Sequence, residues 1–202
     1  MNKLTLLFVL LALFSFRTSD TTLSDKERKF ATDLLTQSRE HLLTSTRGLT
    51  EAQLNFKPDP ESWSVAECAE HLALSETIIF SILEQALQGE PDPARREEVK
   101  IADDQIVGMI TDRSNKVKTR EPFEPRGNYG SHEATVKEFT TKRDEHIQYI
   151  KTTNDDLRNR YATFPFGTLD AYQVVLFMAG HTERHSRQID EVKSHPDFPA
   201  KK

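Results

Sequence analysis

Two short capping motifs, each followed by a helical run of apolar residues, constrain the fold of this chain more than any other feature. The motifs are SDKE, beginning at Ser24, and SVAE, beginning at Ser64. In such a box the Ser side chain accepts a hydrogen bond from the backbone N–H three residues on, and the Glu side chain accepts one from the backbone N–H of the Ser. The box therefore marks the start of a helix. The chain therefore predicts helices over residues 24–48 and 64–89, each stopped by a glycine.

The second half of the chain predicts two further helices. Apolar residues at helical spacing indicate one helix from near Ser131 and another from near Thr168 to about Val192. The connection 89–131 is rich in turn residues, and its segment 101–113 predicts a short amphipathic helix. No strand-like alternation is found. The expected fold is all-α, a four-helix bundle with one long connection that crosses over it.

The N-terminus predicts a separate targeting segment. An apolar run over residues 4–16 lies between two basic residues. As a helix of about 1.5 Å per residue it is shorter than a bilayer core of ~30 Å, so it is typical of a secretory signal peptide. We expect a signal peptide over 1–19, a bundle domain over 24–193 and a frayed tail over 194–202, and hence export to the periplasm or outside. An uncleaved membrane anchor is the alternative.

Composition excludes some classes of protein. The net charge of −5 gives no basic signature for nucleic-acid binding. Cys68 is the one cysteine, so an intrachain disulfide and a lipoprotein anchor are both excluded. The core must therefore stabilise the domain, and Cys68 is expected to be a small buried hydrophobe within it.

Arg143 falls on the apolar stripe of the helix that begins near Ser131. A charge at such a position has two interpretations. The side chain either extends from the edge of the core to water, or it reaches into a pocket to bind an anionic substrate.

His181 and His185 stand four residues apart in the sequence AGHTERHSRQ. At 100° per residue they share one face of the last predicted helix, together with apolar side chains, so both point into the bundle. Two buried imidazoles need hydrogen-bond partners or a metal ion, because an unsatisfied buried polar group costs about 1–3 kcal/mol. Taken alone, the H-x-x-x-H spacing is weak evidence for a metal.

The residues between these histidines exclude two familiar metal motifs. Glu183 lies about 200° round the helix from His181, so it cannot be a ligand of the same ion or its general base. This excludes the protease arrangement, in which Glu directly follows the first His. The zinc deaminase motif needs a P-C-x-x-C element, and this chain has one cysteine.

A third histidine on another inward face would complete a metal site. His71 lies one or two turns into the helix predicted over 64–89, His41 lies on the first helix and His146 on the third. Helical periodicity does not choose among them.

The order of motifs along the chain resembles the DinB-like (DinB/YfiT) family of metalloenzymes. The segments KPDPESWSVAECAEHL and FGTLDAYQVVLFMAGHTERHSRQI carry the resemblance, which extends over roughly residues 25–193. It implies that His71 is the first metal ligand and that His181 and His185 are the others. Arg184 matches the family's Arg before the last ligand, and Gln188 with Ile189 matches the Q-I that follows. The apolar N-terminal run departs from the family pattern.

The resemblance implies a divalent metal held by three histidines at one end of a four-helix bundle. Imidazole ligands suit zinc or nickel first, with iron, manganese and copper as alternatives. Three protein ligands leave a fourth position open, where a bound water has its pKa lowered to about 7. Each imidazole is expected to donate its other N–H to a nearby group, and Glu76 and Asp170 are candidates by location.

Three functions follow as hypotheses. The first is an exported metal-dependent hydrolase of an unidentified small molecule. The second is a thiol S-transferase of the bacillithiol or mycothiol type, in which the metal lowers the pKa of the thiol. The third is a metal-stabilised binding module without catalysis. The resemblance also implies a homodimer, and the sequence identifies no catalytic acid or base.

Overall fold

The computed structural model describes residues 22–115 and 117–200. The signal-peptide prediction, residues 1–19, lies outside the described residues. Within those ranges, no helix combines the length and the apolar character needed to cross a membrane. The described chain is mostly helical, as expected.

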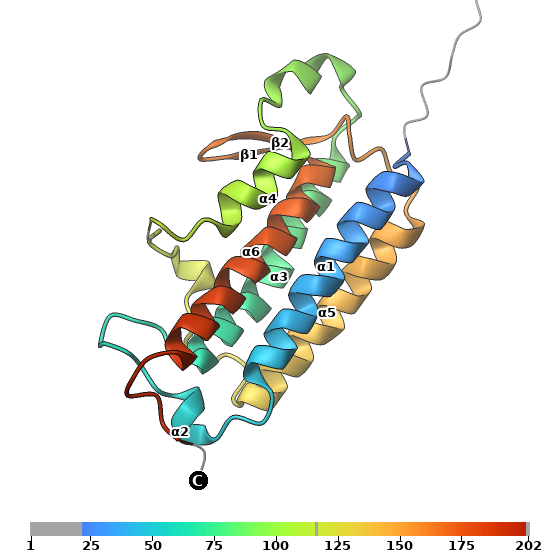
Figure 1. Cartoon of the computed structure of the whole chain (residues 1–202). Helices are drawn as coiled ribbons and strands as arrows, with labels where there is room; N and C mark the ends of the chain where they lie inside the picture. Colours follow the sequence, from blue (N-terminus) through green and yellow to red (C-terminus); the bar gives the residue numbers. More distant parts are fainter. Residues whose placement is uncertain (1–21, 116, 201–202) are drawn as a thin grey trace, which may run out of the picture.

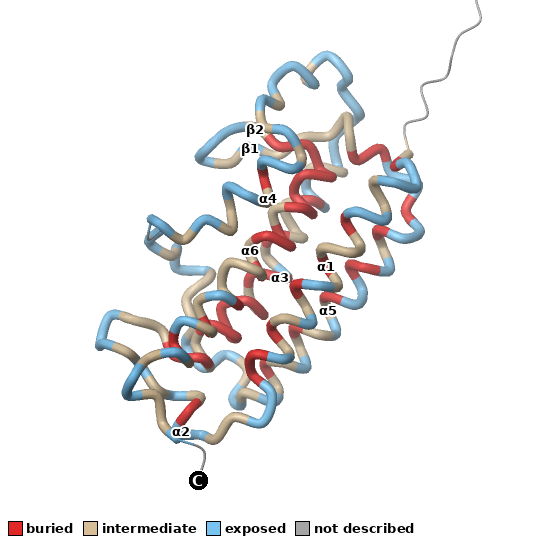
Figure 2. The backbone as a smooth tube through the Cα atoms, in the orientation of Figure 1, coloured by how far each residue is buried: buried red, intermediate tan, exposed pale blue. Residues whose placement is uncertain are grey.

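Four long helices lie side by side (Figure 1). Each of α1 and α3 packs against both α5 and α6. The buried residues follow the faces that these helices turn toward one another, and the exposed residues follow the outer faces and the loops (Figure 2). The helices are α1 (Asp25–Thr46), α3 (Val65–Gln88), α5 (His132–Thr152) and α6 (Ala171–Lys193).

Both capping boxes begin helices where the sequence predicts them. Ser24 accepts from the backbone N–H of Glu27 at 3.3 Å, and the Glu27 carboxylate accepts from the Ser24 N–H at 2.8 Å. Ser64 and Glu67 form the same pair of bonds at 3.2 and 2.8 Å. These bonds satisfy backbone donors that the first helical turn leaves unpaired, so they fix the starts of α1 and α3.

The long connection carries short helices rather than one irregular loop. The amphipathic segment is α4 (Asp103–Thr111), and it packs along α6 (Figure 1). A side chain at Gly180 would lie 3.4 Å from Ile110, so the glycine lets the two helices approach closely. The connection also contains the short helices η1 (Pro93–Glu98) and η2 (Glu121–Phe123). Another short helix, α2 (Glu51–Leu54), lies between α1 and α3.

The prediction of no strands is wrong. β1 (Tyr161–Phe164) and β2 (Gly167–Asp170) form an antiparallel hairpin, with Phe164 opposite Gly167. The last helix therefore begins at Ala171 rather than near Thr168, and Asp170 caps it by accepting from the Gln173 N–H at 2.7 Å. Strands of four residues are too short for a two-residue alternation to stand out in the sequence.

Both interpretations of Arg143 are wrong. Its side chain is fully buried and forms a bidentate ion pair with Glu76 of α3 at 2.8 and 2.6 Å. It therefore neither extends to water nor reaches an open substrate pocket. Cys68 is buried, as expected.

The described part of the tail is not frayed. Its Phe198 ring packs edge-on against Phe56 at 5.5 Å, and the Pro199 carbonyl accepts from Gln53 at 2.9 Å. The chain end therefore lies against the short helix α2 (Figure 1).

His41 joins α1 to α6 through two carboxylates. Its Nδ1 lies 2.8 Å from Glu183 and its Nε2 lies 2.7 Å from Asp190. Burial alone would lower the pKa of His41, but hydrogen bonds and charge attraction from Glu183 and Asp190 raise it above the ordinary value of 6.5.

This cluster predicts a pH-dependent contribution to stability. A raised folded-state pKa means that the contribution is complete below about pH 6.5 and is lost as the pH rises through the folded pKa. We expect His41→Gln to destabilise the protein by up to about 1 kcal/mol near pH 5.5, and by less near pH 9. Urea unfolding at both pH values measures this, with His195→Gln as the control. An equal loss at both pH values would contradict the prediction.

Candidate metal centre

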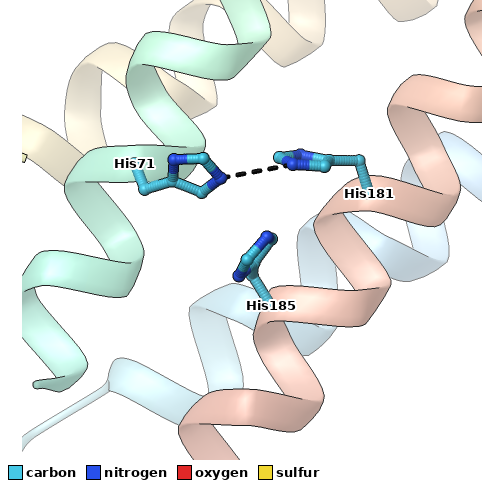
Figure 3. A group of neighbouring side chains, drawn as sticks. All are labelled: His71, His181 and His185. Atoms are coloured by element: carbon cyan, nitrogen blue, oxygen red, sulfur yellow. Dashed lines mark hydrogen bonds between the residues drawn. The ribbon is translucent and has the colours of Figure 1, made fainter. Parts of the chain in front are cut away.

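The packing of α3 against α6 brings three histidines together. His71 comes from α3, while His181 and His185 come from successive turns of α6 (Figure 3). Each ring offers one nitrogen such that the three atoms all lie within 4.8 Å of one another. His71 is buried and the other two residues are half-buried.

The spacing of the nitrogens suits a metal ion. The Nε2 atoms of His71 and His181 lie 3.2 Å apart, on the dashed line of Figure 3. Two nitrogens bound tetrahedrally to zinc at about 2.0–2.1 Å are roughly 3.4 Å from each other. A hydrogen bond could span this contact only if one ring kept a proton on Nε2, whereas a cation between the rings would satisfy both lone pairs.

Hydrogen bonds to the other ring nitrogens orient two of the imidazoles. Nδ1 of His71 donates to the backbone carbonyl of Phe123 at 2.8 Å. Nδ1 of His185 donates to the Gln188 side-chain oxygen at 2.8 Å, and that oxygen also accepts from Arg113 at 3.3 Å. Because both acceptors force the proton onto Nδ1, Nε2 of each ring is left with a free lone pair.

All three imidazoles are held neutral. Burial lowers the pKa of His71 to about 4, against a smaller opposing effect of the Phe123 carbonyl. The pKa of His181 lies well below the ordinary value because of burial and then the neighbouring rings of His185 and His71. Burial and His71 have the same effect on His185. Neutral rings are the form that binds metal, so these residues fit a divalent cation at neutral pH.

Aromatic rings surround the cluster. Trp63 lies 4.8 Å from the His71 ring and 6.0 Å from the His185 ring, measured between centroids. Phe123 lies 6.2 Å from His71, and Phe177 lies stacked 6.0 Å from His181. An apolar shell of this kind limits water near a site and strengthens electrostatic interactions within it.

Two arginines hold the C-terminal end of α4 and the residues after it against α6, next to the site. Arg184, which follows the motif's Glu183, donates to the carbonyls of Ile110 at 3.2 Å and Asn115 at 2.8 Å, and to that of Asp112. Arg113 forms a bidentate ion pair with Glu191 at 2.8 and 2.7 Å. Arg184 therefore binds the backbone of the connection and does not point at the histidine cluster.

The other candidate residues of the sequence lie elsewhere. His41 pairs with Glu183 and Asp190, so the exclusion of Glu183 from the cluster is confirmed. His146 Nδ1 donates to the Glu76 carboxylate at 2.8 Å, and its ring stacks on Phe80, away from the three histidines.

Neither expected carboxylate partner contacts the three rings. Glu76 binds Arg143 and His146, and Asp170 caps α6 while pairing with Arg96 and Arg158. The actual acceptors are the Phe123 carbonyl and Gln188. Gln188 lies one turn from His185, so helical spacing can indicate it as a partner. The Phe123 carbonyl belongs to the backbone of a distant loop, so no residue type in the sequence indicates it.

Comparisons with known proteins point to one family. The family model for the DinB superfamily matches residues 34–189, a range that includes all three histidines. Over 161 residues the chain is 24% identical to the uncharacterised protein YuaE of Bacillus subtilis (strain 168), covering 79% of this chain and 95% of that protein. No solved structure matches at a significant level.

The cluster predicts one divalent metal per chain. We expect the purified protein to hold a near-stoichiometric metal, and His185→Ala to lose far more than the roughly 10–100-fold in affinity that an outer hydrogen-bond partner contributes. Elemental analysis and competition with a chelator measure this. His132→Ala, on a half-buried histidine at the start of α5, is the matched control. Equal metal content in both variants would rule out the site.

Proposed function

Because the chain belongs to the DinB superfamily, we propose that it is a divalent-metal-dependent hydrolase in which His71, His181 and His185 hold the metal. The observation that carries the proposal is the convergence of three neutral imidazoles whose ligand atoms lie within 4.8 Å of one another. Three protein ligands leave at least one position for water or substrate, as in catalytic rather than structural zinc sites.

The residues around the site have separate tasks in this proposal. A bound divalent ion would supply Lewis-acid activation of water and of a polarised substrate group. The Phe123 carbonyl and Gln188 hold two rings in the orientation and tautomer that metal binding needs. The rings of Trp63, Phe123 and Phe177 limit access of bulk water and offer an apolar wall to a small substrate.

The donor set supports particular metals. A cluster of three imidazoles, without a thiolate or a carboxylate among the described ligand candidates, suits zinc or nickel first and iron or manganese as alternatives. The buried Cys68 is kept in the thiol form, because burial raises the pKa of Cys68 far above its ordinary value. It is therefore no ligand in this proposal.

The carboxylates next to the ligands in the sequence are already engaged. Glu70 accepts hydrogen bonds from the backbone N–H groups of Arg126, Gly127 and Asn128 at 3.1, 3.0 and 2.6 Å. Glu183 pairs with His41 and Arg187. Since neither is free to accept a proton at the site, proton transfer in this proposal passes through solvent or the substrate itself.

That same observation favours a second candidate, a thiol S-transferase. A free thiol has a pKa of about 8.5 and is deprotonated outright when it coordinates a metal, so the nucleophile would form without a proton acceptor such as Glu70 or Glu183. The half-buried aromatic rings would then contact the electrophile. The two candidates share the metal site and differ in the nucleophile.

We also propose the finer points of fold and location. The four long helices and α4 correspond to a four-helix bundle whose connection crosses over one face, as the family resemblance implies. Residues 1–19 are proposed to direct export and to be removed. N-terminal sequencing of the protein recovered from the periplasm or medium tests this, and an intact N-terminus at the membrane would favour the anchor instead.

Two activity assays, each run with and without a chelator, should separate the candidate functions. We expect hydrolysis of some member of a panel of esters, amides and phosphodiesters to fall to background on metal removal and to return on adding zinc or nickel. His185→Ala should match the chelated protein. Conjugation of chlorodinitrobenzene, assayed with added thiols, tests the transferase.

The third hypothesis is distinguished by stability. If metal removal lowers the melting temperature strongly while neither assay shows turnover, the protein is a metal-stabilised binding module and both enzymatic proposals fail.

A further inference from the structure

One buried guanidinium joins all four long helices. Arg143 belongs to α5 and is fully buried. Its five N–H donors meet five acceptors, so none is left over. These acceptors are both Glu76 oxygens of α3 at 2.8 and 2.6 Å, Thr182 Oγ1 of α6 at 2.6 Å, and Leu35 O and Ser38 Oγ of α1 at 3.0 and 2.8 Å.

Two of these bonded residues lie close in sequence to the candidate ligands. Glu76 is five residues after His71 on α3, which is about 7.5 Å along a helix. Thr182 directly follows His181 on α6. The guanidinium therefore ties together the two helices that supply the three imidazoles, at a point near the contact between His71 and His181.

The geometry points to Arg143 as a positioning residue of the three-histidine site, acting through Glu76 on α3 and Thr182 on α6. A metal site needs its ligands held within about 0.5 Å and 10–20° of their working geometry. The bidentate bond fixes the direction of the guanidinium relative to α3. The bond to Thr182 then fixes the rotation of α6 about its axis and its position along α3. The inference rests on the metal role proposed for these histidines.

The chain supplies a matched pair of residues for a test. Thr182 Oγ1 donates to the carbonyl four residues before it, Met178, at 3.2 Å and accepts from Arg143. Ser38 Oγ likewise donates to Leu34, four residues before it, at 2.9 Å and accepts from Arg143. Both hydroxyls are buried. They differ in that Thr182 belongs to a helix with candidate ligands and Ser38 does not.

The experiment compares Thr182→Val, Thr182→Ser and Ser38→Ala, all in the full chain. Replacing Arg143 itself would leave Glu76 as an unpaired buried charge, so these hydroxyl variants are more informative. We expect Thr182→Val to weaken zinc binding by about tenfold, as loss of an outer-shell contact does. Thr182→Ser keeps the hydroxyl and should retain wild-type affinity. Ser38→Ala should lower the melting temperature of the chelated protein and leave zinc affinity unchanged.

A purely structural role would give a different result. Arg143 would then only stabilise the core, and Thr182→Val and Ser38→Ala would shift zinc affinity equally or not at all. Either outcome overturns the inference. Competition with a chromogenic chelator measures affinity, and calorimetry of the chelated protein measures stability.

A readout without metal keeps this inference separate from the proposed function. The nitrogen chemical shifts of the His71 and His181 rings report their mutual contact in the chelated protein. Thr182→Val should move them, while Ser38→Ala should not. If the wild type binds none of zinc, nickel, iron and manganese but this difference appears, the proposed function fails and the positioning role stands. If zinc binds and the two variants move the ring signals alike, the positioning role fails alone.

Discussion

The buried pair of Arg143 and Glu76 is the interaction on which the rest of the structure depends. Two charges taken out of water are tolerated only when every donor and lone pair finds a partner, and here Arg143 of α5 finds its partners on the other three long helices. Burial alone would raise the pKa of Glu76, but Arg143 and His146 outweigh it and the pKa lies below its ordinary value. Because breaking such a pair costs about 3–5 kcal/mol, the helices have one favourable register.

The fixed register of the helices also sets the positions of the three histidines, which all lie on helices rather than on loops. A site on two rigid elements inherits their spacing, so the 3.2 Å contact between His71 and His181 is a property of how α3 meets α6. The loops then contribute what helices cannot, namely a backbone carbonyl from Phe123 and an arginine that shares Gln188 with His185.

The sequence predicts local and periodic features of this molecule well and long-range contacts poorly. The capping boxes at Ser24 and Ser64 are local hydrogen-bond patterns, so they appear directly in the residues. Periodicity placed His181 and His185 on one inward face but left His71, His41 and His146 as equal candidates, and only the family resemblance chose His71. The hairpin over 161–170 was missed because its strands are short. The sequence does not indicate the ion pair of Arg143, because its partner Glu76 lies 67 residues away.

The connection between α3 and α5 controls the outer sides of two of the three imidazoles. Phe123 accepts from His71, and Arg113 shares the oxygen that accepts from His185. Proton acceptors in these places set how basic an imidazole is and how it is turned. In the proposed metal site, sequence changes confined to this segment would therefore alter which cation binds, and how tightly, while all three histidines stay the same. In that proposal the connection between α3 and α5 adjusts the metal affinity, and the long helices hold the three histidines in place.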